Sequence, residues 1–296
     1  MAILVGLVIN SRTRATRLQL GGPPVAYCVN KKGDTQIARG GQLIPGDSGA
    51  VLADDEIRLA AGASITLMTA GGFAVLNGPQ SFASGTEAAQ AVGLLATNAL
   101  RAELQTVLFA ATDQLPSSGL VVTRGQQSIP VYSPMGSTAM LTPVLLWKAQ
   151  PEKTYDLQIT DEFDRTQPPW RVAAVTPPLD FSRVEAWRGR PLAKDGLYRL
   201  RITETGRPLT VSEYTFRTLN EPSTAEPDDK LLNAVRVLAY SPARLGDALA
   251  GLLTLPKERA QDELVLRLKL FAFGKLGYAD DYETAASELK RLGSRK

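Results

Sequence analysis

The stretch that most constrains the fold is residues 31–81, where short alternating pieces follow one another between closely spaced turns. Each piece is about four to six residues long, which suits a strand and is too short for a helix. Glycine-containing turns separate the pieces. Residues 56–59 and 64–67 place their aliphatic side chains on one face, namely Ile57, Leu59, Ile65 and Leu67. We therefore expect a compact β-meander that presents surface.

The same stretch carries a family resemblance. Residues 33–82 resemble the FecR-type periplasmic domain through the motifs Arg39-Gly40-Gly41-Gln42-Leu43, Pro45-Gly46-Asp47, Asp54-Asp55-Glu56-Ile57-Arg58-Leu59 and Ala63-Ser64-Ile65-Thr66-Leu67. The resemblance implies a small β-module of bacterial envelope proteins that sense or scaffold, with no catalytic activity. It also implies a location in the periplasm or cell envelope.

The N-terminal run of residues 2–9 is apolar and bears on location. Its eight residues are far fewer than the roughly 20 that span a bilayer. The run also lacks the basic start and the clear small-residue cleavage site of a signal peptide. We interpret it as a buried first strand, with an atypical export segment as the alternative. A cytoplasmic location therefore stays open.

Composition excludes several classes of function. The chain has 296 residues, 44% hydrophobic and 21% charged, which predicts about two soluble globular domains, or three small ones. The net charge of +3 gives no reason to expect nucleic acid as a partner. The absence of histidine excludes Ser-His-Asp and Cys-His catalysis and histidine metal ligands. The single cysteine excludes an intramolecular disulfide, and neither glycine pair has the context of a nucleotide-binding loop. We expect no enzyme activity and no cofactor.

A helix is predicted after the meander. Ser84 and Glu87 have the spacing of a capping box, and apolar residues then recur at three- and four-residue steps. We expect one helix over residues 86–113, inserted in a first domain that covers residues 1–133. Strand character returns at 119–123 and 127–132 and completes that domain.

A second β domain is expected over residues 134–220. Strand candidates lie at 143–148, 154–160, 170–175, 196–203 and 211–218. The pattern resembles an immunoglobulin or fibronectin type III sandwich through Trp147, the Tyr155 strand, Asp195-Gly196-Leu197-Tyr198-Arg199-Leu200 and Tyr214-x-Phe216. This resemblance concerns architecture and implies no ligand.

The C-terminal part is expected to be helical. Residues 221–227 have no apolar period and are interpreted as a linker, and residues 228–296 contain four helical patterns. Residues 264–292 resemble one tetratricopeptide-like helical pair. A single pair cannot bury both faces, so the segment is either a capped bundle or half of an interface. The predicted fold class is thus mainly β with α, in several domains.

Candidate partner-binding residues come from two places. Trp187 is followed by Arg188 and Arg190 in a polar loop, a composition typical of an exposed interface anchor. The C-terminal helices contribute the second group, Phe271, Phe273 and Tyr278. For Trp187, a core role is the competing interpretation.

Two acidic clusters are candidates for a metal or catalytic site. Asp161, Glu162 and Asp164 directly follow a strand, and their oxygens suit calcium. The cluster lacks the glycine and distal glutamate of a calcium loop, so we interpret it as a solvated turn and expect no metal. Asp54 and Asp55 are neighbours in the sequence, and this closeness is no evidence for the separation between two carboxylates that glycoside hydrolysis requires.

The sequence favours a non-catalytic scaffold or sensory protein that assembles a bacterial envelope complex through protein partners, with homo-oligomers among the options. One alternative is a protein that binds or cleaves cell-wall carbohydrate, with Trp170, Trp187, Tyr155 and Tyr198 as an aromatic platform. The other alternative is a subunit of a filament or shell.

Overall fold

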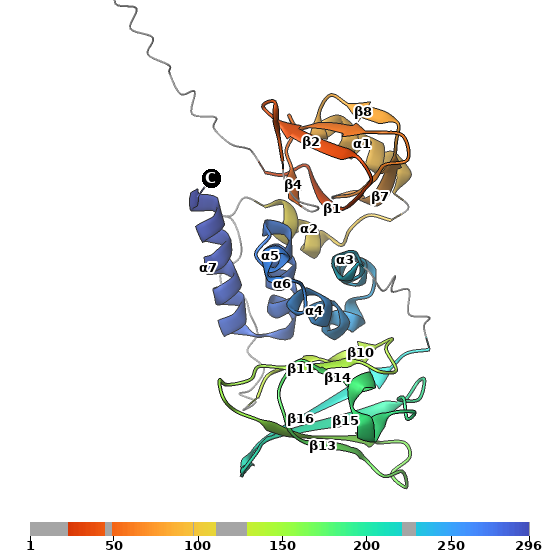
Figure 1. Ribbon diagram of the computed structural model, residues 1–296, viewed down its shortest axis with the longest axis vertical. Helices are drawn as coiled ribbons and strands as arrows, with labels where there is room; N and C mark the ends of the chain where they lie inside the picture. Colours follow the sequence, from red (N-terminus) through yellow and green to blue (C-terminus); the bar gives the residue numbers. More distant parts are fainter. Residues whose placement is uncertain (1–22, 45–48, 97, 111–128, 221–228, 296) are drawn as a thin grey trace, which may run out of the picture.

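A computed structural model describes residues 23–44, 49–96, 98–110, 129–220 and 229–295. Two β units lie at opposite ends of the molecule, and a layer of helices lies between them (Figure 1). The structure is mixed β and α, with 34% strand and 33% helix, so the presence of both element types is confirmed and strands do not predominate as expected. The N-terminal run 2–9, the strand at 119–123 and the linker 221–227 lie outside the described residues.

The first β unit contains two four-stranded sheets, with strand orders β4-β1-β6-β7 and β3-β2-β5-β8. The strands are β1 Ala26–Lys32, β2 Thr35–Arg39, β3 Gln42–Leu43, β4 Gly49–Val51, β5 Glu56–Leu59, β6 Ser64–Thr69, β7 Gly72–Asn77 and β8 Gln80–Phe82. The four aliphatic residues of the alternating pieces, Ile57, Leu59, Ile65 and Leu67, all lie in its core. The strand prediction from period-two alternation is confirmed here.

The helix expected over residues 86–113 is interrupted, and this part of the prediction is wrong. Two helices are present, α1 Gly85–Leu95 and α2 Ala102–Phe109, with extended backbone at Ala96 and Arg101. The capping box holds, because the Ser84 hydroxyl accepts the Glu87 N–H at 3.1 Å. The break has a tertiary cause. A Cβ at Gly72 would lie 2.2 Å from the Asn98 carbonyl oxygen, so the chain between the helices packs directly on the start of β7.

The second β unit has a five-stranded sheet, β10-β16-β15-β12-β13, and a three-stranded sheet, β14-β11-β9. Its strands are β9 Val131–Ser133, β10 Gly136–Thr138, β11 Val144–Trp147, β12 Tyr155–Asp161, β13 Trp170–Val175, β14 Leu179–Asp180, β15 Leu197–Glu204 and β16 Arg207–Thr218. All five predicted strands are found. Strand β9 precedes the expected boundary at residue 134, yet it pairs with β11 in this unit.

The helical layer consists of α3 Lys230–Tyr240, α4 Leu245–Leu253, α5 Lys257–Ala260, α6 Glu263–Leu276 and α7 Ala279–Arg295. Helix α6 is buried on nearly every side, because α2, α4 and α7 all pack against it. Helix α4 also packs on β9, β10 and β11 of the second β unit. None of the described helices has the length and apolarity that a membrane crossing requires.

The helices share one hydrophobic core with both β units. The cluster extends from Tyr27 on β1 through Trp147 on β11 to Leu289 on α7. Polar contacts reinforce the junction with the first unit. The Arg267 guanidinium, 1% exposed, donates to the carbonyl oxygens of Val107 at 2.9 Å and Ala110 at 3.0 Å. The helical segment is therefore a bundle covered on both sides by the β units.

Candidate functional site

Trp187 is buried and is not the exposed anchor expected from its loop. It is 2% exposed, its ring lies 4.9 Å from that of Phe181, and its indole N–H donates to the Arg171 carbonyl oxygen at 3.1 Å. Residues Glu185–Trp187 form a short 3₁₀ turn that folds the loop back onto the β unit. The polar neighbours of Trp187 in the loop are exposed to solvent, so the composition of the loop does not reveal that the tryptophan is buried.

The two arginines beside Trp187 differ from each other. Arg188 is exposed, whereas Arg190 donates to the Pro168 carbonyl oxygen at 2.9 Å and lies over the Trp170 ring. Trp170 is itself 3% exposed. All four members of the proposed sugar platform, Trp170, Trp187, Tyr155 and Tyr198, are core residues. The carbohydrate alternative therefore loses the aromatic surface on which it was based.

The helical aromatic residues are also engaged inside the molecule. Phe271 and Phe273 are buried, and Tyr278 is partly buried. Phe273 and Tyr278 both pack against the ring of Tyr132, and the Tyr278 hydroxyl donates to the Val131 carbonyl oxygen. Phe273 and Tyr278 thus contact the second β unit of the same chain, and the burial of Phe271 and Phe273 contradicts the expectation of a free docking surface at these positions.

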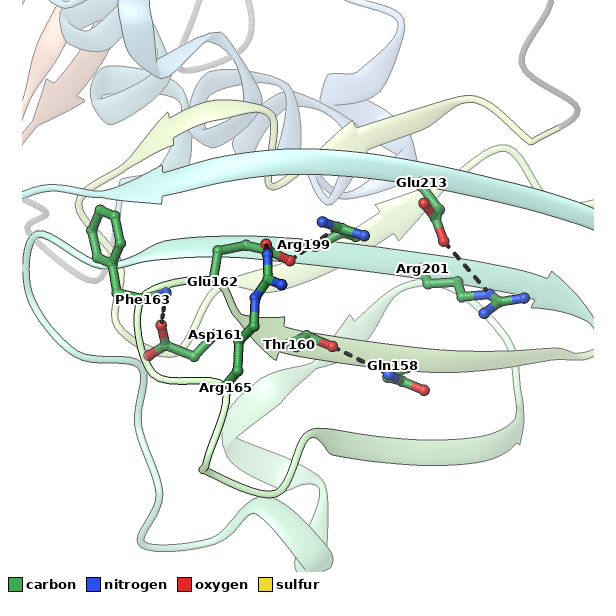
Figure 2. A network of polar contacts seen from close by, with 9 residues as sticks. All are labelled: Gln158, Thr160, Asp161, Glu162, Phe163, Arg165, Arg199, Arg201 and Glu213. Carbon is green, nitrogen blue, oxygen red and sulfur yellow. Dashed lines mark hydrogen bonds and ion pairs between the residues drawn. The ribbon is translucent and has the colours of Figure 1, made fainter.

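The acidic cluster forms a turn held by local hydrogen bonds and ion pairs (Figure 2). One Asp161 oxygen accepts the N–H groups of Phe163 at 2.9 Å and Asp164 at 3.0 Å. Glu162 pairs with Arg165 at 2.9 Å and with Arg199 at 3.0 Å. A hydrogen bond from Thr166 lowers the pKa of the Asp164 carboxyl. Within the described ranges, no group of three or more possible ligands is arranged to hold a metal ion.

Asp55, from the other acidic pair, has a structural role. Its carboxylate is fully buried and pairs with the Arg39 guanidinium at 2.8 Å. It also accepts the Leu52 N–H at 2.7 Å. A buried carboxylate needs such partners, and these contacts hold the turn before β5 against β2.

The structure contains a cleft that the sequence did not reveal. Its volume is about 1160 Å³, and it lies between the second β unit and helices α3 and α4. One wall comes from β11, β13, β14 and the segment that follows, and the other from the two helices. The first β unit contributes Phe73. The apolar lining residues are Phe73, Met140, Val144, Val172, Val175, Pro178, Leu179, Val184, Ala234, Val237, Tyr240 and Ala250.

Most polar side chains of the cleft interact with each other. Arg244 pairs with Asp247 at 2.9 Å, and both residues are buried. Asp247 also accepts the Ala139 N–H through the same oxygen, and its other oxygen has no hydrogen-bond partner among the described residues. Lys230 donates to the Thr254 hydroxyl at 3.1 Å. The remaining surface of the cleft is mainly aliphatic, which suits an apolar ligand.

A weak signal of the cleft exists in the sequence. On α3, the apolar residues Ala234, Val237 and Tyr240 recur at three-residue steps and all line the cleft. Such a stripe predicts a helix face that contacts something. It does not identify the opposite wall, because β13 and β14 lie far away in sequence.

Comparison with known proteins identifies no relative. No family model matches the chain, and no curated protein or solved structure matches it either. The proposal for its function therefore rests on the cleft and on the way the units surround it.

Proposed function

We propose that the protein is a non-catalytic scaffold that holds an apolar segment of a protein partner in the cleft. One observation supports this proposal above the others. Both β units and the helical layer contribute side chains to the same cleft. A segment bound there contacts all three parts of the molecule at once, which suits a protein that assembles others.

Size and chemistry favour a polypeptide segment over a small molecule. The cleft volume of about 1160 Å³ exceeds the roughly 300–1,000 Å³ typical of small-molecule pockets. Apolar grooves beside helices are a recurrent means of peptide recognition. The buried Arg244–Asp247 ion pair is used within the protein, which favours binding over turnover.

The resemblances in the sequence are compatible with this role. The FecR-type pattern of residues 33–82, the immunoglobulin-like pattern of the second β unit and the helical pair α6–α7 are all known from non-catalytic, surface-presenting modules. On the same resemblance we propose a bacterial envelope complex as the setting.

The test uses a site-specific photo-crosslinker at Val237, in the cleft, and at Leu209, which is 98% exposed and does not line it. We expect a protein to be captured from Val237 and not from Leu209. The captured protein is then purified, and its affinity is measured. Val237→Glu places a charge on the apolar wall and should weaken binding about tenfold or more, which is about 1.4 kcal/mol. Leu209→Glu should leave affinity unchanged.

Equal affinity of the wild type and Val237→Glu, with folding verified by circular dichroism, would refute the proposal. Point substitution is preferable to removal of residues 228–296. The helices share their core with both β units, so their removal exposes the apolar faces of those units and confuses binding with unfolding.

A further inference from the structure

We propose that the outer face of the five-stranded sheet binds an extended acidic segment of a partner protein. Four exposed arginines define this surface, which we call the arginine face: Arg171 on β13, Arg199 and Arg201 on β15, and Arg217 on β16. In Figure 1 these strands lie on the side of the second β unit away from the helical layer. The inference concerns a second surface of the molecule and does not depend on the cleft.

The strand register places the four arginines on one face. Buried and exposed residues alternate along β15 and the second half of β16, so Arg199, Arg201 and Arg217 share the exposed side. Gln158 of β12 pairs with Arg201 on one side and with Arg171 on the other. Because residues directly opposite each other in a sheet point to the same face, Arg171 joins the other three.

The carboxylates on this face neutralise the arginines only in part. Glu162 is shared between two arginines, Arg199 at 3.0 Å and Arg165 at 2.9 Å (Figure 2). Glu213 lies 3.8 Å from Arg201, and both side chains are about half exposed. Such an exposed and distant ion pair is weak and is easily exchanged for another carboxylate.

Two arginines of the face carry a charge that the described residues leave uncompensated. Neither Arg171 nor Arg217 forms an ion pair with any described residue. Asp156, the third acid on the face, already accepts hydrogen bonds from the Ala174 N–H and the Thr205 hydroxyl, each at 2.9 Å. The guanidinium groups of Arg171 and Arg217 are therefore available to carboxylates of another molecule.

The choice of arginine is itself informative. None of the five strands of the sheet contains a lysine. Lysine solvates a surface as well as arginine does, whereas only the planar guanidinium forms two parallel hydrogen bonds with one carboxylate. Protein interfaces are accordingly enriched in arginine and depleted in lysine. The composition of the face favours recognition of carboxylates over solvation alone.

The spacing of the arginines matches an extended peptide. Arg199 lies opposite Thr215 of β16, so Arg217 is its diagonal neighbour, about 7–8 Å away. Arg201 is two residues from Arg199 on the same strand, about 7 Å away. Alternate side chains of an extended peptide are also about 7 Å apart and point the same way. A segment with acidic residues at every second position therefore presents one carboxylate to each of these three arginines.

Two features of the face favour a protein segment over nucleic acid. Glu162 and Glu213 lie among the arginines and repel an unbroken row of phosphates, whereas an acidic peptide has uncharged residues that can lie beside them. Single-stranded nucleic acid also stacks its bases on exposed aromatic rings. The aromatic residues of the five strands are all buried, namely Tyr155, Trp170, Tyr198, Tyr214 and Phe216.

The first test compares two labelled peptides of equal composition on the full chain by fluorescence anisotropy. In one peptide three glutamates alternate with threonine, and in the other the three glutamates are consecutive. We expect the alternating peptide to bind at least about fivefold more tightly, because its carboxylates lie on one side of the extended chain. Equal affinity of the two peptides would overturn the proposal.

The second test changes the face itself. Arg199→Glu/Arg201→Glu should weaken binding of the alternating peptide at least about tenfold, since two charge-assisted contacts become repulsive. The matched control Arg188→Glu/Lys194→Glu makes the same change in net charge at two exposed loop positions. It should keep the affinity within about twofold, because exposed charges are screened over a short distance. Equal weakening in both variants, with folding verified by circular dichroism, would overturn the proposal.

A milder variant tests the register without reversing a charge. Arg217→Gln removes a guanidinium that has no ion pair with a described residue, so the fold should be undisturbed. We expect the affinity for the alternating peptide to fall about threefold or more. Unchanged affinity would likewise count against the proposal.

Two further measurements separate this surface from other possibilities. Single-stranded DNA of about 20 nucleotides should bind more weakly than the alternating peptide, and equal or tighter binding would overturn the assignment to a protein partner. Val237→Glu, in the cleft, should leave the affinity for the alternating peptide unchanged. A loss of affinity in Val237→Glu would place the peptide in the cleft and overturn the proposal. Because each surface has its own variant and its own ligand, the arginine face and the proposed function fail separately.

Discussion

The rings of Phe73 on β7 and Tyr240 on α3 pack with their centroids 5.4 Å apart and their planes tilted by 43°. The Arg236 guanidinium lies 5.8 Å from the centre of the Phe73 ring. The Tyr240 hydroxyl donates to the Asn98 carbonyl oxygen at 3.1 Å. This group joins the first β unit to the helical layer, at the point where both line the cleft.

The aromatic pair should contribute measurably to stability. A double-mutant cycle with Phe73→Ala and Tyr240→Ala should give a coupling free energy of about 0.5–1.5 kcal/mol, because tilted aromatic pairs gain this much beyond burial. Chemical denaturation of the four proteins measures it. As a control, Phe73→Ala and Phe163→Ala should be additive within about 0.5 kcal/mol, because Phe163 is exposed on the other β unit. Zero coupling between Phe73 and Tyr240 would show that the contact is not formed in solution.

Truncation of Trp187 should destabilise the second β unit. Trp187→Ala should lower the free energy of unfolding by about 3–5 kcal/mol, since a large buried ring and its hydrogen bond to Arg171 are lost. Arg188→Ala, its exposed neighbour, should change stability by no more than about 0.5 kcal/mol. Urea denaturation followed by tryptophan fluorescence measures both. A small effect of Trp187→Ala would restore the alternative of an exposed anchor.

Two glycine-to-alanine substitutions should have opposite signs. A Cβ at Gly246, on α4, would lie 2.6 Å from the Met135 backbone nitrogen, so Gly246→Ala must push α4 away from the second β unit. We expect a loss of about 1–3 kcal/mol. A Cβ at Gly93, in α1, meets nothing within 4 Å, so Gly93→Ala should stabilise by about 0.5–1 kcal/mol. Thermal melting of both variants checks the signs, and two equal shifts would contradict the close contact at Gly246.

Alkaline pH should destabilise the fold in part through Tyr214. Burial raises the pKa of Tyr214 to about 12, and its hydroxyl donates to the Ile129 carbonyl oxygen. The pKa of an unfolded tyrosine is about 10. Below pH 10 both states keep the proton and the stabilisation is complete; from pH 10 to 12 the unfolded state ionises first, so stability is lost.

The measurement for Tyr214 is the free energy of unfolding against pH for the wild type and Tyr214→Phe. Tyr27 and Tyr132 also have raised pKa values because they are buried, so both proteins should lose stability in this range. The decline should be smaller in Tyr214→Phe, because one ionisation is absent. Parallel curves between pH 10 and 12 would mean that Tyr214 titrates with its ordinary pKa.

Local patterns predicted most elements of the fold. The alternation of Ile57 and Leu59 placed β5, and the 3.6-residue period placed α3, α4, α6 and α7. The break between α1 and α2 was missed, since the helical period continues through it. Only the approach of Asn98 to Gly72, whose lack of a Cβ permits it, ends the helix there.

The site residues were predicted less well, and for a common reason. Trp187, Phe271 and Phe273 were recognised as large aromatic side chains that must contact a partner, and that partner proved to be the chain itself. The cleft was not predicted, because its walls come from segments as distant as β7, β14 and α4. A polar or apolar neighbourhood in sequence does not reveal which distant segment will cover a side chain.

The amino-acid sequence alone determined the type of most strands and helices, and the absence of histidine chemistry, because these depend on residue identity and on short-range period. The tertiary structure decided where α1 ends, which aromatic residues are covered, and that three separate parts of the chain line one cleft. Burial is a relation between residues far apart along the chain. Only the packing of the helices between the two β units specifies it.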